Sequence, residues 1–259
     1  MTINQEKETE KKWFQTWFES PYYLKLYGHR DTNEAQQTVR LILTCLEELR
    51  GKGAEKPKLL DVACGAGRHA VQFAKEGLSI TANDLSEFLL TEARRLSIEH
   101  SAKLRFTQND MRRLPFRDEF DAAVQLFTSF GYFEDPLDDE RTLISVSRSL
   151  KQKGIYVLDY LNPAVLRSKL TPKNEKLIDG VRYVETRYIQ GDQVVKHIDI
   201  YDKDMIHNFT ESVRLYEPYD LKMLITSSGF QVRKLLGDYE GNPFNESSSP
   251  RLIIFAQKV

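Results

Sequence analysis

Apolar residues recur along the chain with two spacings that alternate from segment to segment. Some segments carry them at every third or fourth position, which is typical of a helix with one buried face. Others are short and almost continuously apolar, which is typical of a strand buried on both sides. Helices are predicted over Glu6–Phe18, Asn33–Arg50, Gly67–Lys75, a segment opening after Ser86, Pro136–Leu150 and Pro218–Ser228. Strands are predicted over Lys58–Ala63, Leu78–Asn83, Leu104–Thr107, Asp121–Phe127, Ile155–Tyr160, Gln231–Leu236 and Arg251–Lys258.

The first five strands are separated by helical segments, and this alternation predicts the fold class. Strand–helix–strand units pair their strands in parallel, because the helix returns the chain to the same end of the sheet. The prediction is therefore an α/β fold with a doubly wound, mostly parallel sheet.

A different pattern follows Asn162 and Pro163. Val181–Ile189, Val194–Asp202 and Asn208–Leu215 are long and rich in β-branched and aromatic residues, and a Gln-Gly-Asp-Gln turn separates the first two. These segments predict an antiparallel β meander inserted into the α/β domain. Because the meander follows the fifth strand, we expect it at the carboxyl ends of the strands, where it covers the ligand.

The chain is thus expected to have three regions. The first is an amino-terminal helical lid with a cofactor-binding core, the second is the inserted meander, and the third is a closing helix with the last two core strands. Their predicted ranges are 1–162, 163–216 and 217–259.

Composition excludes several classes of protein. Of the 259 residues 41% are apolar and 29% are charged, which is typical of a globular chain and not of a disordered or fibrous one. Lysine plus arginine (37) nearly balances aspartate plus glutamate (38), so no overall field attracts a nucleic acid or an anionic membrane. No apolar run approaches the roughly 20 residues of a membrane span, and the charged amino terminus does not resemble a signal peptide. We expect a cytoplasmic monomer or homodimer without membrane or nucleic-acid partners.

Only two cysteines occur, Cys45 and Cys64, and each stands in an apolar periodic segment. Two are too few for a disulfide framework or a cysteine-based zinc site. Both are expected to be buried free thiols, and no metal is expected.

The sharpest local signal is Leu59 to His69, Leu-Leu-Asp-Val-Ala-Cys-Gly-Ala-Gly-Arg-His, in which a strand passes through a glycine turn into a helix. Gly65 and Gly67 let the backbone approach a ligand, and the free N–H groups at the helix start carry partial positive charge. Asp84 stands nineteen residues after Gly65, at the end of the next strand, where a carboxylate accepts hydrogen bonds from both hydroxyls of a ribose. These features predict an adenosine-type ligand, with Asp84 exposed and making few structural contacts. The simpler alternative is a tight turn and an N-capping aspartate.

Two common nucleotide-binding motifs do not fit this segment. The dinucleotide motif G-x-G-x-x-G fails because Ala63 occupies the first glycine position and the third glycine has no counterpart. A phosphate-binding loop fails because no Gly-Lys-Ser/Thr follows. Asp61, in contrast, stands where its carboxylate can reach an ammonium group.

The segment from Leu59 to Tyr160 resembles the class I S-adenosylmethionine-dependent methyltransferases. The first stretch of the resemblance is Asp61 to Gly67, which is similar to the family motif D-x-x-C-G-x-G and is followed by the acidic strand end Asn83 to Ser86. The other matching stretches are Asn109 to Met111 with Leu114 to Phe116, similar to the adenine-contacting loop; Phe120-Asp121 and Gln125 to Tyr132, similar to the fourth motif; Gly229-Phe230 before the closing strand; and Pro21 to Arg30, similar to the lid of bacterial members with an inserted sheet.

The resemblance implies S-adenosylmethionine as cofactor and a seven-stranded sheet whose last strand is antiparallel. It implies that Asp110 accepts a hydrogen bond from the exocyclic amine of adenine. The residues implied as cofactor contacts are Asp61, Ala63, Gly65, Gly67, Asp84, Leu85, Asp110, Met111, Gln125, Tyr27 and Arg30. The chain departs from the family pattern at Ala63, where glycine is usual, and at Asn83, where a small or apolar residue is commoner.

The chemistry of this cofactor indicates what the enzyme must do. A sulfonium methyl is attacked in line by an uncharged nucleophile, so the two must be aligned and water excluded. An amine acceptor need only arrive deprotonated, whereas a hydroxyl or carbon acid needs a base. The sequence identifies no base. Tyr132, just past the fourth strand, is a candidate substrate-facing residue, and His197 on the meander is another, although a surface role is the more ordinary one for His197.

Three functions are compatible with these features. We expect a methyltransferase that acts on a small molecule. A protein or nucleic-acid acceptor is disfavoured because Gln125 to Thr128 replaces the Asn/Asp-Pro-Pro-Tyr motif and no basic cluster with interleaved aromatics occurs. A module that binds an adenosine ligand without turnover is the third alternative, because fold does not fix function.

Overall fold

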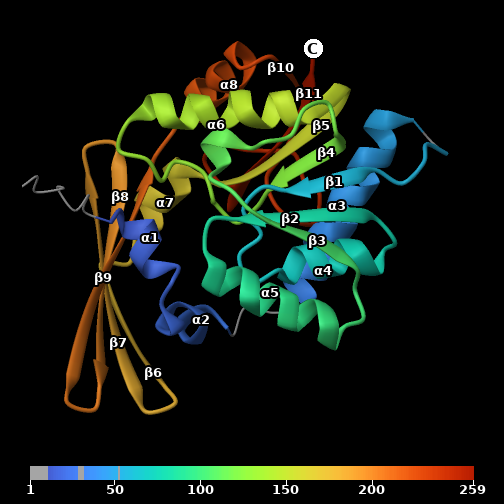
Figure 1. Cartoon of the computed structure of the whole chain (residues 1–259). Helices are drawn as coiled ribbons and strands as arrows, with labels where there is room; N and C mark the ends of the chain where they lie inside the picture. The colour runs from blue at the N-terminus through green and yellow to red at the C-terminus, as the bar shows by residue number, and fades with distance from the viewer. Residues whose placement is uncertain (1–10, 29–31, 52) are drawn as a thin grey trace, which may run out of the picture.

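The computed structural model describes residues 11–28, 32–51 and 53–259, which form two separate β-sheets (Figure 1). The larger sheet has seven strands in the order β10-β11-β5-β4-β1-β2-β3. Its strands are β1 (Lys58–Asp61), β2 (Ser79–Asp84), β3 (Leu104–Gln108), β4 (Phe120–Gln125), β5 (Leu150–Leu161), β10 (Phe230–Leu236) and β11 (Arg251–Lys258). Strands β1 to β5 pair in parallel, and β11 runs antiparallel to both β5 and β10. The predicted seven-stranded sheet with an antiparallel last strand is confirmed.

Helices cover both faces of this sheet (Figure 1). The helices of one face pack around Ile42, Phe73 and Leu90, and those of the other around Leu143 and Ile225. The first face carries α3 (Thr32–Arg50), α4 (Arg68–Lys75) and α5 (Glu87–Glu99), and the second carries α6 (Pro136–Ser149) and α8 (Pro218–Ser227). Interior positions of the central strands, such as Leu59, Leu60, Ala122 and Val124, are apolar because these strands are buried on both sides.

The smaller sheet is antiparallel and has four strands in sequence order. They are β6 (Lys173–Ile178), β7 (Val181–Gln190), β8 (Gln193–Asp202) and β9 (Met205–Arg214). The predicted meander lacked β6 and the short helix α7 (Pro163–Lys169), so the number of strands was wrong. Strand β6 is an edge strand whose residues alternate between exposed and half-buried, and it therefore lacks the apolar face that would reveal it.

The amino-terminal segment lies between the two sheets as two short helices, α1 (Trp13–Trp17) and α2 (Pro21–Tyr27). A helix over 6–18 was predicted, but its residues 6–10 lie outside the described residues. Ser20 caps α2 by accepting a hydrogen bond from the Tyr22 amide, and Pro21 occupies the first turn, which is why a second helix starts here.

Both cysteines are buried and free, as predicted. Among the residues that the structure describes, no helix is both long and apolar enough to span a membrane, and no cluster of side chains is suited to hold a metal ion.

Candidate functional site

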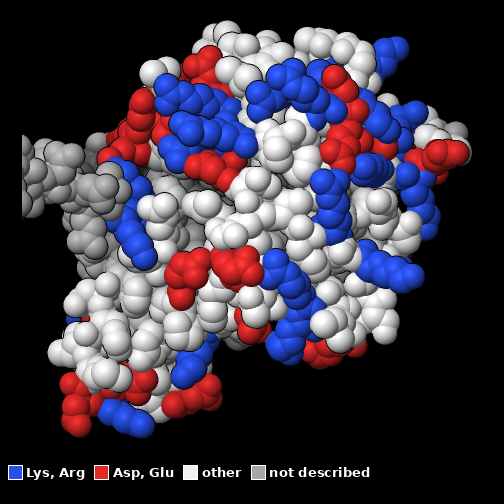
Figure 2. Space-filling view, in the orientation of Figure 1, with Lys and Arg blue, Asp and Glu red and all other residues white. Residues whose placement is uncertain are grey.

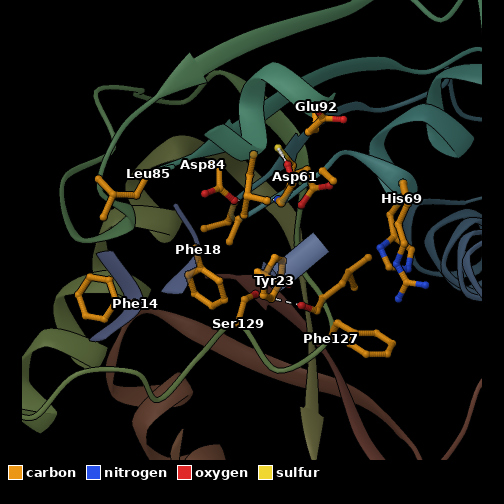
Figure 3. Close-up of a pocket in the computed structure, with 18 of the residues that line it drawn as sticks. Phe14, Phe18, Tyr23, Asp61, His69, Asp84, Leu85, Glu92, Phe127 and Ser129 are labelled. Atoms are coloured by element: carbon orange, nitrogen blue, oxygen red, sulfur yellow. Dashed lines mark hydrogen bonds between the residues drawn. The ribbon is translucent and has the colours of Figure 1, made fainter. Parts of the chain in front are cut away.

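A cavity of about 410 Å³ lies at the carboxyl ends of β1, β2 and β4, beneath α1 and α2 (Figure 3). Its walls come from five parts of the chain. They are the two amino-terminal helices, the loop after β1 with the start of α4, the end of β2 with one side of α5, the turn after β3 and the loop after β4. The predicted contacts Asp61, Ala63, Gly65, Asp84, Leu85, Asp110, Met111, Tyr27 and Tyr132 all line this cavity.

The two glycines of the loop after β1 have different roles. Gly65 has a φ of +56°, and a Cβ atom added there would project into open space. Gly67 has a φ of +81°, and an added Cβ would lie 2.8 Å from Cβ of Ala93 on α5. Gly65 therefore keeps the cavity open, whereas Gly67 allows α4 to approach α5. Gly67 does not line the cavity, so its requirement for glycine comes from helix packing.

Asp84 is buried and holds the neighbouring loop in place. Its carboxylate accepts hydrogen bonds from the Gly65 amide at 2.7 Å and from the Ser86 amide at 3.0 Å. Burial raises its pKa, and these two hydrogen bonds oppose that rise. The expectation of an exposed Asp84 with few structural contacts was wrong, because the strand end lies under the amino-terminal helices.

Asn83, which departs from the family pattern, joins the ends of three strands. Its amide nitrogen donates to the Val62 and Asn109 carbonyl oxygens, each at 3.0 Å. Its side-chain oxygen accepts from Thr107 and Asn109, each at 3.0 Å. Every hydrogen-bonding position of this fully buried amide is thus used, and the three loops that line one end of the cavity are tied together.

Asp61 is a buried carboxylate that faces the cavity near Asp84 (Figure 3). None of the residues that the structure describes donates a hydrogen bond to its carboxylate. Loss of water around the carboxylate, together with the charge of Asp84, raises its pKa to about 8. A cation in the cavity would relieve both effects, so this position suits an ammonium group.

Asp110 and Gln125 are both engaged in holding the cavity wall. Asp110 caps the 3₁₀ helix η1 (Met111–Arg113) and pairs with Arg112 at 2.6 Å. Burial raises the pKa of Asp110, but the hydrogen bonds and charge of Arg112 outweigh it, so the pKa is lowered. Gln125 was predicted to contact the cofactor, but it is fully buried and lies behind the wall. Its amide donates to the Ser129 carbonyl oxygen at 2.6 Å and contacts Sδ of Met111 at 3.4 Å, so it positions two residues that do line the cavity.

The loop after β4 forms a third wall. Phe127 and Thr128 adopt φ values of +59° and +62°, a left-handed conformation that costs roughly 1–2 kcal/mol for each non-glycine residue. Tyr132 packs edge-on against Trp13, with ring centres 5.0 Å apart. Phe127 lines the cavity and was missed by the sequence analysis, because nothing in its neighbourhood signals a left-handed backbone.

The second sheet supports the cavity indirectly, through helices α1 and α2. Tyr27 of α2 donates to Glu211 at 2.6 Å, Trp17 of α1 donates to it at 2.7 Å, and Lys196 pairs with it at 2.5 Å. None of the cavity-lining residues comes from the second sheet, so the expectation that the meander covers the ligand directly was wrong. The sheet lies at the predicted end of the strands and supports the helices that form the cover (Figure 1).

Two further residues were predicted for the site, His197 and Arg30. His197 is exposed, on the face of β8 opposite the amino-terminal helices, where it bonds to Tyr188 at 2.9 Å and Thr210 at 3.0 Å. Arg30 lies outside the described residues.

A family model described as a methyltransferase domain matches residues 59–154, which run from β1 into β5. Over this segment the chain matches a methyltransferase domain, and the resemblance to the class I S-adenosylmethionine-dependent methyltransferases is confirmed. The cavity lies beside Gly65, within the segment that resembles this family's first motif.

Relatives of known sequence extend the match beyond this domain. YqeM of Bacillus subtilis, which carries a provisional methyltransferase name, is 27% identical over 79% of this chain and 85% of its own. The dTDP-3-amino-3,4,6-trideoxy-alpha-D-glucopyranose N,N-dimethyltransferase of Streptomyces venezuelae is 32% identical over 43% of this chain and 45% of its own. A glycine/sarcosine N-methyltransferase of Aphanothece halophytica is 26% identical over 75% of this chain and 73% of its own.

Solved structures share the whole fold. The CcbJ methyltransferase of Streptomyces caelestis superposes with a TM-score of 0.79 at 16% identity, covering 95% of this chain and 98% of its own. An S-adenosylmethionine-dependent methyltransferase from Clostridium acetobutylicum gives a TM-score of 0.77 at 20% identity, covering 92% and 96%. At these identities the likeness shows the fold alone.

Proposed function

We propose that this methyltransferase transfers a methyl group from S-adenosylmethionine to a small-molecule acceptor held under α1 and α2. The observation that carries the proposal is the cavity itself. Two buried carboxylates, Asp61 and Asp84, stand at one end, and aromatic side chains of the amino-terminal helices cover it (Figure 3). A cavity covered in this way suits an acceptor small enough to be enclosed.

The residues present fit the cofactor. Open space in front of Gly65 leaves room for a ligand beside the backbone. Among the described residues none donates a hydrogen bond to the Asp61 carboxylate, and an ammonium group would supply one. We propose that Asp84 accepts hydrogen bonds from the ribose hydroxyls and that Leu85 and Met111 pack against adenine. When bound, the cofactor supplies a methyl group on a positively charged sulfur.

The remaining lining residues would orient the acceptor and exclude water. Phe18, Tyr23 and Phe127 present aromatic surface at the cavity (Figure 3), which disfavours water and attracts positive charge. Tyr132 stays a candidate for contact with the acceptor, since it lines the same wall.

A small-molecule acceptor is also supported by the relatives, whose names specify an amino sugar and glycine or sarcosine as substrates. A macromolecular acceptor is less well supported. In the orientation of Figure 2, lysine and arginine residues are interspersed with aspartate and glutamate, and no wide basic area appears.

The experiment is incubation with methyl-tritiated S-adenosylmethionine and an extract of the source cells separated by size. Label in the low-molecular-mass fraction supports the proposal, and Asp61→Asn is expected to reduce it at limiting cofactor. Label confined to protein or nucleic acid would contradict the small-molecule acceptor. Binding of S-adenosylhomocysteine without any transfer would indicate a module without turnover.

A further inference from the structure

The strained turn after β4 is held by residues that come from later in the chain. Phe127 and Thr128 are the one pair of adjacent non-glycine residues with positive φ within ranges 11–28, 32–51 and 53–259. Phe127 faces the cavity beside Ser129 (Figure 3). A backbone shape that neither residue favours persists only where its surroundings hold it.

Asp159, on the neighbouring strand β5, fixes the direction of both backbone amides in this turn. Its carboxylate accepts a hydrogen bond from the Phe127 amide at 2.9 Å, and its backbone carbonyl accepts one from the Thr128 amide at 2.9 Å. Asp159 is fully buried, so water does not substitute for it.

Two further residues complete the arrangement. Arg251, the first residue of β11, donates to the Asp159 carboxylate at 2.7 Å and to Oγ1 of Thr128 at 2.9 Å. Tyr239 donates to the same carboxylate at 2.8 Å. We call Asp159, Arg251 and Tyr239 the turn clamp.

The turn clamp also bears on the cavity wall through the Phe127 ring. The Arg251 guanidinium lies 5.5 Å from the centre of that ring, and the Arg68 guanidinium lies 4.5 Å from it. Arg68 is the first residue of α4, directly after the glycine loop. The Phe127 ring therefore lies within cation–π range of Arg251 in the turn clamp and of Arg68, which directly follows the loop that we propose binds the cofactor.

We infer that the turn clamp is a set of positioning residues for methyl transfer, which hold Phe127 and Ser129 in the shape that aligns the acceptor with the cofactor. None of its three members lines the cavity, so their action is indirect. The inference rests on the proposed function, because it assigns the turn to the acceptor side of the same cavity. The turn clamp adds one residue each from β5, β11 and the loop before β11. The residues that line the cavity all come from about the first half of the chain.

The test compares Asp159→Asn with a matched control, Asp121→Asn. Asp121 stands at the opposite end of β4, where its carboxylate accepts the Lys58 amide at 2.9 Å and pairs with Lys151 at 2.9 Å. Both variants lose a carboxylate that holds a backbone amide, but only Asp159→Asn disturbs the turn. Exchange of the amides over residues 126–130 is expected to quicken by more than tenfold in Asp159→Asn and to stay at the parent rate in Asp121→Asn.

A second substitution distinguishes a positioning role of Asp159 from a contribution to overall stability. Asp159→Asn is expected to lower the labelling rate of the low-molecular-mass fraction by at least tenfold at saturating S-adenosylmethionine. Adding Thr128→Gly should recover a large part of that rate, since glycine adopts positive φ without support, while the melting temperature stays low. An equal rate in the single and double variants, or parent-like exchange and turnover in Asp159→Asn, would overturn the inference. If the parent protein binds no S-adenosylhomocysteine, the proposed function fails instead, whatever the variants do.

Discussion

The two ends of the cavity are built in different ways. At the end proposed for the nucleoside, Asp61, Gly65 and Asp84 stand within about one strand–helix–strand unit, and Asp84 accepts hydrogen bonds from the backbone amides of Gly65 and Ser86. At the opposite end, the wall after β4 and the helices above it are held by side chains from β5, β9 and β11. The first end can be encoded in a short motif, whereas the second depends on contacts between residues far apart in sequence. Substitutions at the two ends should therefore differ in what they change.

The largest effect is expected from valine at the two glycines of the first end. In Gly65→Val the side chain enters open cavity space, so S-adenosylhomocysteine should bind more than a hundredfold more weakly to protein that still folds. In Gly67→Val the side chain meets Ala93, so unfolding free energy should fall by about 3 kcal/mol. Calorimetric titration and thermal melting distinguish the two. Equal losses of binding and stability in the two variants would contradict the assignment of Gly65 to the cavity and of Gly67 to helix packing.

Asp84→Asn is expected to weaken S-adenosylmethionine and S-adenosylhomocysteine alike, by roughly ten- to a hundredfold, as for hydrogen bonds to a charged group. Alanine is a poorer test, because it would leave the Gly65 and Ser86 amides without their acceptor. The nucleoside 5′-methylthioadenosine, which lacks the amino-acid portion, should lose affinity for Asp84→Asn but not for Asp61→Asn. Parent-like affinity in Asp84→Asn would limit this residue to holding the loop.

Asp61 makes cofactor binding dependent on pH. Its pKa is raised to about 8, so the carboxyl is protonated at pH 6 in the empty protein. Pairing with an ammonium group requires the ionised form, and binding at pH 6 to 7 therefore releases a proton. Affinity should rise by up to about tenfold per pH unit from 6 to 7.5 and level off near pH 8, where a free α-amino group itself loses its proton.

Titration in two buffers of different ionisation enthalpy measures the released proton. Asp61→Asn should remove both the proton release and the rise with pH. By the same linkage, a raised pKa means that the folded empty protein holds this proton more tightly than the unfolded chain does. That contribution to stability is present below about pH 4 and is lost as pH rises towards 8.

The smallest change in ligand affinity is expected from Glu211→Gln, at the end of the cavity covered by α1 and α2. The variant keeps an oxygen for Trp17 and Tyr27 but loses the ion pair with Lys196, so binding of S-adenosylhomocysteine should weaken by about two- to fivefold. Glu175→Gln on the same sheet is the control, because its ion pair with Arg182 is half exposed and is worth less than about 1 kcal/mol. An identical response of the two variants would mean that the second sheet does not act on the cavity.

The nucleoside end could be predicted from the sequence because its signals are local. A continuous apolar run predicts β1, glycines mark the turn, and an aspartate follows the next strand. In the structure these residues lie around one cavity, and Asp84 also holds the glycine loop through a hydrogen bond that its position in the sequence did not indicate. The parallel pairing of the first five strands could also be predicted, since a helix between two strands returns the chain to the same end of the sheet.

The second end could not be predicted, since its residues carry no signal of their partners. Gln125 occupies a motif position but its amide faces Met111 and Ser129 behind the wall. Nothing near Phe127 indicates positive φ, because the hydrogen bonds that hold it come from Asp159, 32 residues later in the chain. His197 has the residue type expected of a base, but strand alternation alone does not say which face of β8 is buried.

The lid helices have a consequence for the rate of ligand exchange. Helix α1 has five residues and α2 has seven, and helices this short are not stable by themselves in water. They are folded because Trp17 and Leu26 pack against the second sheet. If ligands leave by displacing these helices, each departure requires a local unfolding event with its own free energy, much smaller than that of the whole protein. Dissociation of S-adenosylhomocysteine is then expected to quicken at mild denaturant concentrations that leave the seven-stranded sheet intact.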